Sequence, residues 1–330
     1  MALKLNERYP GRFNGPTAGY PQGSFKNRTT PTAKDGSYLE QDWANDKEGF
    51  FQSLLSDAGF VASGAVDAVG ASQFFDAMKA VVRKMSLGVA GSTASLKMTV
   101  ATASSSATVT ADEIVVKSAI GGLSYIIPSF NKTINLAAAG AGGMDTGSAP
   151  VNGWVALYAI YNPTSGASSI LAVNSPNAVM PAVYGGANMP SGYTASALLT
   201  VVPTNASGQL KVCSVRGRDV FIQLATAYMG NASVVDNPIS IAGIVPANAV
   251  LILNGEITLQ NTAQSAMSLT VKPDASAVGQ QNITGLVGAG GALVSNYSML
   301  PLNTDQVLMF TSSSSAGTPT YGIYIGGYRL

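Results

Sequence analysis

The sequence predicts a mainly β protein in which an extended arm and a short helical segment precede an antiparallel β-sandwich body, jelly-roll-like in character. Three observations support this fold class. After residue 86, short runs of β-branched and aromatic residues are separated by Gly, Pro, Asn and Ser, as in antiparallel sandwiches. Apolar residues at helical spacing are confined to residues 39–84. Residues 1–36 show neither pattern and are rich in Gly and Pro.

Residues 1–36 are predicted to be an extended arm that binds another protein. Such Gly- and Pro-rich sequence cannot form a core alone, so we expect the isolated arm to be mobile. Aromatic and Arg side chains are typical anchors of protein interfaces. A solvated tail, the simplest alternative, has little need of the eight residues that alternate here: Arg8, Tyr9, Arg12, Phe13, Tyr20, Phe25, Lys26 and Arg28.

Two short helices are predicted next, over residues 39–55 and 72–84. Ser37 and Glu40 have the spacing of a capping box, Gly59 follows the first helix, and Ser72 is a plausible N-cap of the second. The two apolar stripes hold more aromatic surface than two lone helices bury, so we expect burial against sister chains or a docking ring. The stripes consist of Leu39, Trp43, Phe50, Phe51, Leu54 and Leu55, and of Phe74, Phe75, Met78, Val81 and Val82.

The remaining sequence predicts a series of strands, with no repeat of solenoid length. The expected domains are the arm (1–36), a helical attachment domain (37–92) and the body (93–330), with a possible break into two subdomains near residue 216. The strands are expected at 96–101, 107–110, 114–117, 124–127, 132–136, 153–161, 169–173, 194–202, 210–215, 219–224, 239–241, 249–260, 265–272, 306–311 and 321–328.

Composition argues against several functional classes. The net charge is +1 and charged residues make up 11%, so binding to nucleic acid or to an acidic membrane is not expected. Nineteen of the 35 charged residues lie in 1–92, which leaves a charge-poor body. The chain has no His, and its single Cys213 lies in an apolar run typical of a packed strand residue. No apolar run is long enough for a membrane span or a signal peptide.

No motif predicts catalysis, a cofactor or a metal. The Gly-rich segments 140–143 and 285–291 lack the context of a phosphate-binding loop and are interpreted as flexible loops. Asp112 and Glu113 are adjacent in a strand, so their side chains are expected on opposite faces. A glycan-hydrolysing pair or a cation cluster remains the less favoured alternative for five isolated carboxylates: Asp219, Asp236, Glu256, Asp274 and Asp305.

Two segments of the body, 184–189 and 295–299, combine Tyr with small polar residues and are interpreted as loops. Antibody paratopes use the same composition, because Tyr offers contact area at low entropic cost. Tyr184, Tyr193 and Tyr297 are therefore candidate contacts to a host receptor. Ordinary surface loops and contacts between subunits are the alternatives.

The chain resembles tail-fibre proteins of tailed bacteriophages. Residues 9–82 resemble their N-terminal virion-attachment segment, above all at 20–28, 43–46 and 70–77. Residues 153–161 and 189–193 are similar to a β-sandwich module of phage fibre and tail proteins. The resemblance implies a trimeric fibre whose N-terminus is fixed to the virion while its C-terminal part points outward. The chain departs from this family because it has no long shaft.

The sequence therefore predicts a homotrimeric structural protein of the virion tail, assembled in the host cytoplasm, without enzymatic activity. Its expected partners are other tail, baseplate or collar proteins and a glycan or protein receptor on the bacterial surface. One alternative is an adaptor fibre that carries another receptor-binding protein. The other is a tailspike that degrades a glycan.

Overall fold

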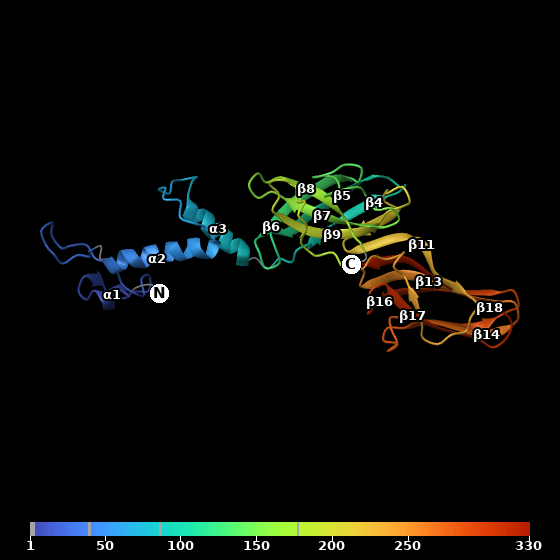
Figure 1. Cartoon of the computed structure of the whole chain (residues 1–330). Helices are drawn as coiled ribbons and strands as arrows, with labels where there is room; N and C mark the ends of the chain where they lie inside the picture. Colours follow the sequence, from blue (N-terminus) through green and yellow to red (C-terminus); the bar gives the residue numbers. More distant parts are fainter. Residues whose placement is uncertain (1–3, 39–40, 86–87, 177) are drawn as a thin grey trace. The chain divides into compact units, whose positions relative to one another are not determined.

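A computed structural model describes residues 4–38, 41–85, 88–176 and 178–330 (Figure 1). The chain forms two compact units, Met1–Ser86 and Leu87–Leu330, which we call the N-terminal and the C-terminal unit. The N-terminal unit contains the helices, and the C-terminal unit consists of antiparallel sheets. This confirms the mainly β class with a short helical segment and a sandwich body.

The arm has local structure of its own. A short helix α1 (Leu5–Arg8) is followed by two paired strands, β1 (Phe13–Asn14) and β2 (Ser24–Phe25). The Ser37 hydroxyl accepts the Lys26 backbone N–H at 2.8 Å and donates to the Arg12 carbonyl at 2.6 Å. Three points of the arm that are distant in sequence are thereby tied together.

The first predicted helix is present and extends beyond its expected end at residue 55. Helix α2 spans Gln41–Ala58, whereas residues 39–40 lie outside the described residues, and with them the Glu40 half of the predicted capping box. The Ser37 hydroxyl bonds Lys26 and Arg12 of the arm, and the capping-box partner predicted for it, the backbone N–H of Glu40, lies outside the described residues, so the box stays a prediction. Gly59 has φ +75°, and the N–H of Phe60 reaches the carbonyl of Leu55 at 2.9 Å. The predicted end of this helix at Gly59 is thus confirmed.

Helix α3 (Gln73–Met85) begins at the predicted cap. The Phe75 N–H donates to the Ser72 hydroxyl at 3.1 Å. The Asp67 carboxylate, which the sequence did not single out, accepts from Ser72 at 2.6 Å and from the N–H groups of Gln73 and Phe74 at 3.0 and 3.2 Å. The first turn of α3 is therefore capped from two positions.

The C-terminal unit begins with one sandwich built from β3 to β10. In this half one sheet continues in the order β10, β4, β5, β9, β7 and β8, and β3 and β6 also pair with β5. Strands β7 and β9 are buried along almost their whole length, so they form the centre of this half. The strands are β3 (Thr93–Ala94), β4 (Lys97–Val100), β5 (Ser106–Lys117), β6 (Ser124–Asn135), β7 (Trp154–Tyr161), β8 (Ser168–Asn174), β9 (Ala195–Pro203) and β10 (Cys213–Arg216).

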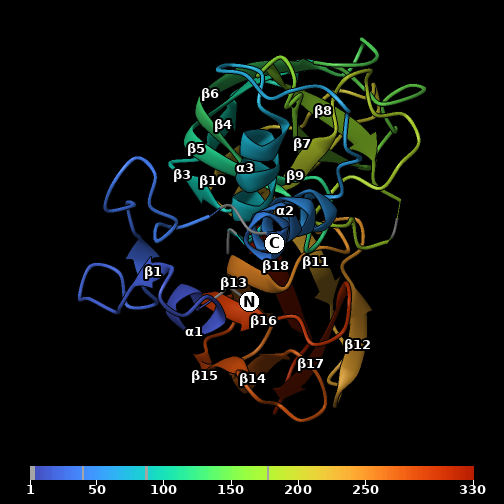
Figure 2. The ribbon, with the colours of Figure 1, turned by 90° about the vertical axis from the view of Figure 1, so that its left-hand side faces the viewer.

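A second sandwich follows. Strands β16, β13, β18 and β11 form one layer, and β12, β17, β14 and β15 form the other (Figure 2). Tyr228 and Phe310 meet between the layers with ring centroids 4.3 Å apart. The strands are β11 (Asp219–Gly230), β12 (Asn237–Ser240), β13 (Leu251–Asn261), β14 (Ser265–Lys272), β15 (Gln281–Val287), β16 (Ala292–Pro301), β17 (Val307–Ser314) and β18 (Pro319–Arg329).

One sheet runs through both halves of the C-terminal unit. The possible break near residue 216 coincides with the β10–β11 hairpin, across which the twelve-stranded sheet continues. The Tyr328 hydroxyl of β18 donates to the Val201 carbonyl of β9 at 2.7 Å, and the Tyr328 ring packs edge-on against Trp154 at 5.9 Å. The two halves therefore share hydrogen bonds as well as apolar contacts.

Some predicted loops were wrong. Residues 295–299, interpreted as a loop, belong to β16, whereas of residues 285–291 only the first three belong to β15 and the others form the turn before β16. The two strand pairs expected on either side of residues 111–113 and 128–131 are single long strands, β5 and β6. Asp112 and Glu113 are both exposed, contrary to the opposite faces expected, because the buried positions of β5 shift from odd to even residues between Ala111 and Ile114.

Candidate attachment surface

A row of aromatic rings connects the arm to helix α2 within the N-terminal unit. The ring centroids of Tyr9 and Phe13 are 5.6 Å apart, those of Phe13 and Phe25 are 5.1 Å apart, and those of Phe25 and Trp43 are 5.5 Å apart. The last two contacts are edge-to-face, an arrangement that favours aromatic pairs beyond the area they bury. The arm is therefore held against the first helix by its own aromatic residues.

The four cations of the arm that were predicted to contact a partner also have partners within the chain. Arg8 pairs with Asp42, and Arg12 bonds the Lys34 carbonyl while its guanidinium lies 4.4 Å from the centre of the Tyr38 ring. The remaining two make local contacts: Lys26 lies 3.9 Å from Asp35, and Arg28 donates to the Pro31 carbonyl at 2.8 Å. Exposed ion pairs contribute little to stability and exchange readily for other partners, so these cations remain accessible.

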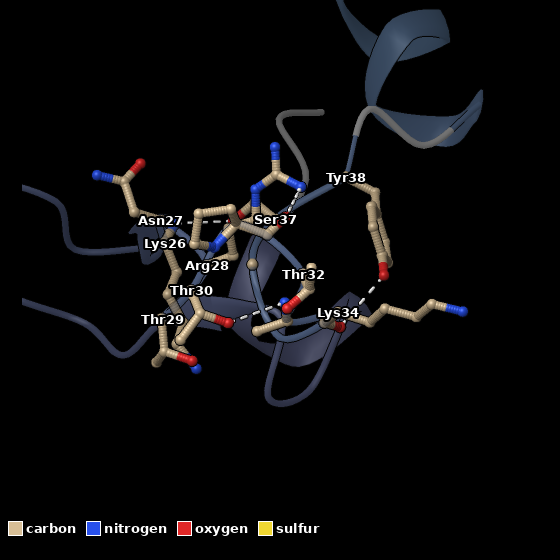
Figure 3. Close-up of a pocket in the computed structure, with 12 residues that line it drawn as sticks. Lys26, Asn27, Arg28, Thr29, Thr30, Thr32, Lys34, Ser37 and Tyr38 are labelled. Carbon is tan, nitrogen blue, oxygen red and sulfur yellow. Dashed lines mark hydrogen bonds between the residues drawn. The ribbon is translucent and has the colours of Figure 1, made fainter.

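The end of the arm folds into a loop that encloses an open pocket of about 1060 Å³ (Figure 3). Its wall includes the cationic side chains of Lys26, Arg28 and Lys34, together with several threonines. The Thr29 N–H donates to the Asp35 carboxylate at 3.0 Å, and this bond is the main reason why the pKa of Asp35 lies below its usual value. A side chain at Gly36 would meet the Arg28 backbone nitrogen at 2.7 Å, so the loop closes only with glycine there.

The eight predicted arm residues differ in how they are placed. Phe13 is only 6% exposed and supports the fold of the arm, so the expectation that all four rings are available to a partner does not hold for it. Tyr20 and Phe25 are exposed by 64% and 49%. The structure brings the rings of Tyr9, Phe13 and Phe25 together and leaves Tyr20 outside the row.

Helix α3 carries an apolar stripe that the described residues of the N-terminal unit leave largely exposed, although the Lys79 ammonium lies 4.7 Å from the centre of the Phe75 ring. Its buried face consists of Ala77 and Ala80, and the Phe74 ring lies 4.7 Å from that of Phe51 on α2. Phe75, Met78 and Val82 are exposed and lie three and four residues apart, so they line one side of the helix. Exposed apolar side chains continue at Phe50 on α2 and in the loop before α3, at Phe60, Val61, Val66 and Val69.

Two of the three tyrosines predicted to contact a receptor are buried. Tyr297 is 2% exposed, lies in β16 over the space left by Gly255, and donates to the Tyr324 carbonyl at 2.8 Å. Tyr184 is also buried, and its hydroxyl donates to Asp145 at 2.9 Å. Burial, followed by the Asp145 carboxylate, raises the pKa of Tyr184. Both were wrong as surface contacts because interior partners bind their hydroxyls, whereas Tyr193 is half-buried at the edge of the core.

Three of the five isolated carboxylates of the body have structural partners. Arg329 donates to both oxygens of Asp219 at 2.5 and 2.8 Å, Lys272 pairs with Asp236, and Asn303 donates to Asp274 at 2.6 Å. Among the described residues, no three side chains of His, Cys, Asp or Glu gather where a metal ion would bind. These contacts account for the positions of three of the five carboxylates that the sequence left open.

Cys213 lies in β10 opposite Val100 and Ile222, as expected of a packed strand residue. The side chain is 4% exposed, and burial raises the pKa of the thiol to about 12. A thiol in this setting stays protonated at neutral pH and is a poor nucleophile.

No protein-family model matches this chain, and no curated protein matches it. None of the helices in the described part of the chain is long and apolar enough to span a membrane. The resemblance to tail-fibre proteins therefore stays a prediction that depends on the residues quoted for it.

Proposed function

We propose that the protein is a structural component of a bacteriophage virion, a homotrimeric tail fibre that attaches to the particle through its N-terminal unit and contacts the bacterial surface through its C-terminal unit. The observation that carries the proposal is the apolar surface of the N-terminal unit. Phe75, Met78 and Val82 on α3 and Phe50 on α2 are exposed in the single chain. Large apolar side chains that gather on the exposed side of a helix are characteristic of protein interfaces.

Two different contacts are assigned to this unit. The stripe of α3 packs against the same stripe in sister chains, since closed rotational symmetry covers an apolar face without open-ended growth. The exposed rings of Tyr20 and Phe25, with the basic loop 26–38, contact a tail, baseplate or collar protein. Arg12 and Arg28 exchange their carbonyl partners within the chain for acceptors on that protein.

We assign to the C-terminal unit the binding of a receptor and no catalytic activity. Its carboxylates are engaged in structural pairs at Asp219, Asp236 and Asp274, and its one thiol is buried and protonated. Receptor contacts of modest affinity suffice here, because a trimer multiplies them through avidity. The receptor class, a surface glycan or protein, is carried over from the resemblance.

The test combines particle labelling with a paired substitution. Gold-labelled antibody against the C-terminal unit should mark the tails of phage particles. Particles produced with Tyr20→Ser plus Phe25→Ser should lack the protein, while Ile120→Ser plus Val179→Ser, equally exposed positions of the body, should leave its occupancy unchanged. Full occupancy with the first pair would contradict the assigned attachment surface. Release of oligosaccharide from host glycans would favour the tailspike instead.

A further inference from the structure

The C-terminal unit has a second open surface, at an edge of strand β11. This strand pairs with β18 from Asp219 to Gly230, but with β10 only from Asp219 to Ile222. Along residues 223–230, no described strand pairs with the other edge of β11. Backbone donors and acceptors there are left for an added strand, because an open edge is a template for pairing.

A bulge explains why β11 leaves β10. Between the pairs Phe221–Gly327 and Ala225–Ile325, three residues of β11 face the single residue Gly326 of β18. Such a bulge bends the strand and increases its twist. A side chain at Gly327 would meet the Val220 carbonyl at 2.9 Å, so the close approach of β18 at this point depends on glycine. The bend is therefore encoded in both strands.

An apolar pocket lies beside the open edge. It has a volume of about 400 Å³, within the range of ligand-binding pockets, and its walls include Trp154, Ile222, Leu224 and Ile244. The Trp154 ring is held in place by Tyr328 at 5.9 Å and by a bond from its indole N–H to the Ala242 carbonyl at 3.4 Å. The wall is thus formed before anything binds.

The rim of the pocket is basic. Of the described residues that line it, Lys211 alone carries a charge, and its side chain is exposed. Gln223 adds an uncharged donor and acceptor on β11 itself. An occupant that combines an apolar group with a carboxylate matches this lining.

We propose that β11 binds an extended peptide segment of a partner protein by strand addition. The backbone of the segment pairs with residues 223–230, one large apolar side chain enters the pocket, and a neighbouring carboxylate of the segment pairs with Lys211. The backbone bonds supply affinity, while the pocket and Lys211 select the side chains. A free small molecule would fill the pocket but leave the adjacent edge of β11 unpaired. A peptide would occupy both the pocket and the edge, so we favour a peptide.

The full-length protein is tested with a peptide of about six residues, the usual length of a strand, that alternates threonine and leucine and contains one aspartate. The chain has two Trp residues, so Trp43→Phe leaves Trp154 as the reporter of binding by fluorescence. The expected preference over the same peptide with lysine at the acidic position is about two- to fivefold, the scale of an exposed ion pair. Lys211→Glu should reverse this preference, and N-methylation of the peptide backbone should abolish binding.

The matched pair of variants is Leu224→Arg, at the pocket, and Val294→Arg, an equally exposed apolar position on β16. Leu224→Arg should weaken binding at least about tenfold, since it places a charge in the apolar pocket, and Val294→Arg should not change it. Equal binding of the N-methylated peptide, or no effect of Leu224→Arg, would overturn the proposal. So would a smaller oligomer with Leu224→Arg, because the edge would then be a contact between copies of the chain.

Discussion

The hydroxyl of Ser37 links two distant parts of the arm, because it forms hydrogen bonds with the backbone of both Lys26 and Arg12. In Ser37→Ala, the Lys26 amide loses its acceptor, and we expect it to exchange with solvent about fivefold faster, the effect of one lost hydrogen bond of about 1 kcal/mol. Amide exchange followed by NMR measures this directly. Ser53→Ala is the control, because that hydroxyl bonds only its own helix at Gly49. Equal exchange rates of the Lys26 amide in Ser37→Ala and in the wild type would show that the Ser37 hydrogen bonds do not stabilise the arm.

Asp67 makes the start of α3 sensitive to acid. The Ser72 hydroxyl and then the N–H groups of Gln73 and Phe74 lower the pKa of this carboxyl. Since its pKa in the folded state lies below the unfolded value of about 3.9, its stabilisation is complete above that pH and is lost as pH falls through the folded pKa. Amide shifts of Phe74 followed against pH should show this transition, and Asp67→Asn should abolish it. An identical titration in the variant would contradict the assignment.

Local sequence predicted some of these residues and missed others. Ser72 and Gly59 were recognisable because each acts on backbone groups within a few residues. Tyr184 was not, because its position depends on Asp145, 39 residues away in the sequence. The bonds of Ser37 to Lys26 and Arg12 were missed for the same reason, since these partners lie 11 and 25 residues away in the sequence.

At the scale of elements, strands with regular alternation were predicted well and glycine-interrupted strands were not. β13 and β14 matched the expected segments to within about two residues. β15 and β16 were missed because Gly285 and the Ser- and Asn-rich run 295–299 have the composition of loops. Gly285 fits within β15 because Leu293 approaches it from β16. That constraint comes from packing and is invisible in the strand's own residues.

Substitution at Gly327 of β18 should destabilise the close approach of β18 to the bend in β11. A Cβ there would meet the Val220 carbonyl and the Asn254 side chain, each at 2.9 Å. We expect Gly327→Val to lower the free energy of unfolding of the C-terminal unit by about 1–3 kcal/mol, as overpacking does. Calorimetry measures this loss of stability. Gly243→Val is the control, because no heavy atom lies within 4 Å of a Cβ added at Gly243. Equal melting temperatures of the two variants would contradict this account of the bend.

For the whole molecule, the proposed trimer depends on the stripe of α3. Phe75→Asp plus Met78→Asp places charges where apolar contacts between copies are expected, so we expect dissociation to monomers at micromolar concentration. Sedimentation equilibrium measures the mass. Gln52→Asp plus Ser56→Asp, on an exposed polar part of α2, is the control and should remain trimeric. A wild-type monomer at this concentration, or a trimer that survives the α3 substitutions, would contradict the prediction.

The burial of Cys213 has a practical consequence for chemical labelling of the protein. The chain has one thiol, and that thiol is enclosed in β10, so maleimide dyes should leave the native protein unlabelled. A cysteine introduced at an exposed position, for example by Gln52→Cys, then becomes a single-site handle without replacing the native residue. The same enclosure keeps disulfides from forming between copies. Electrophoresis in denaturant without reductant should therefore separate any assembly into single chains.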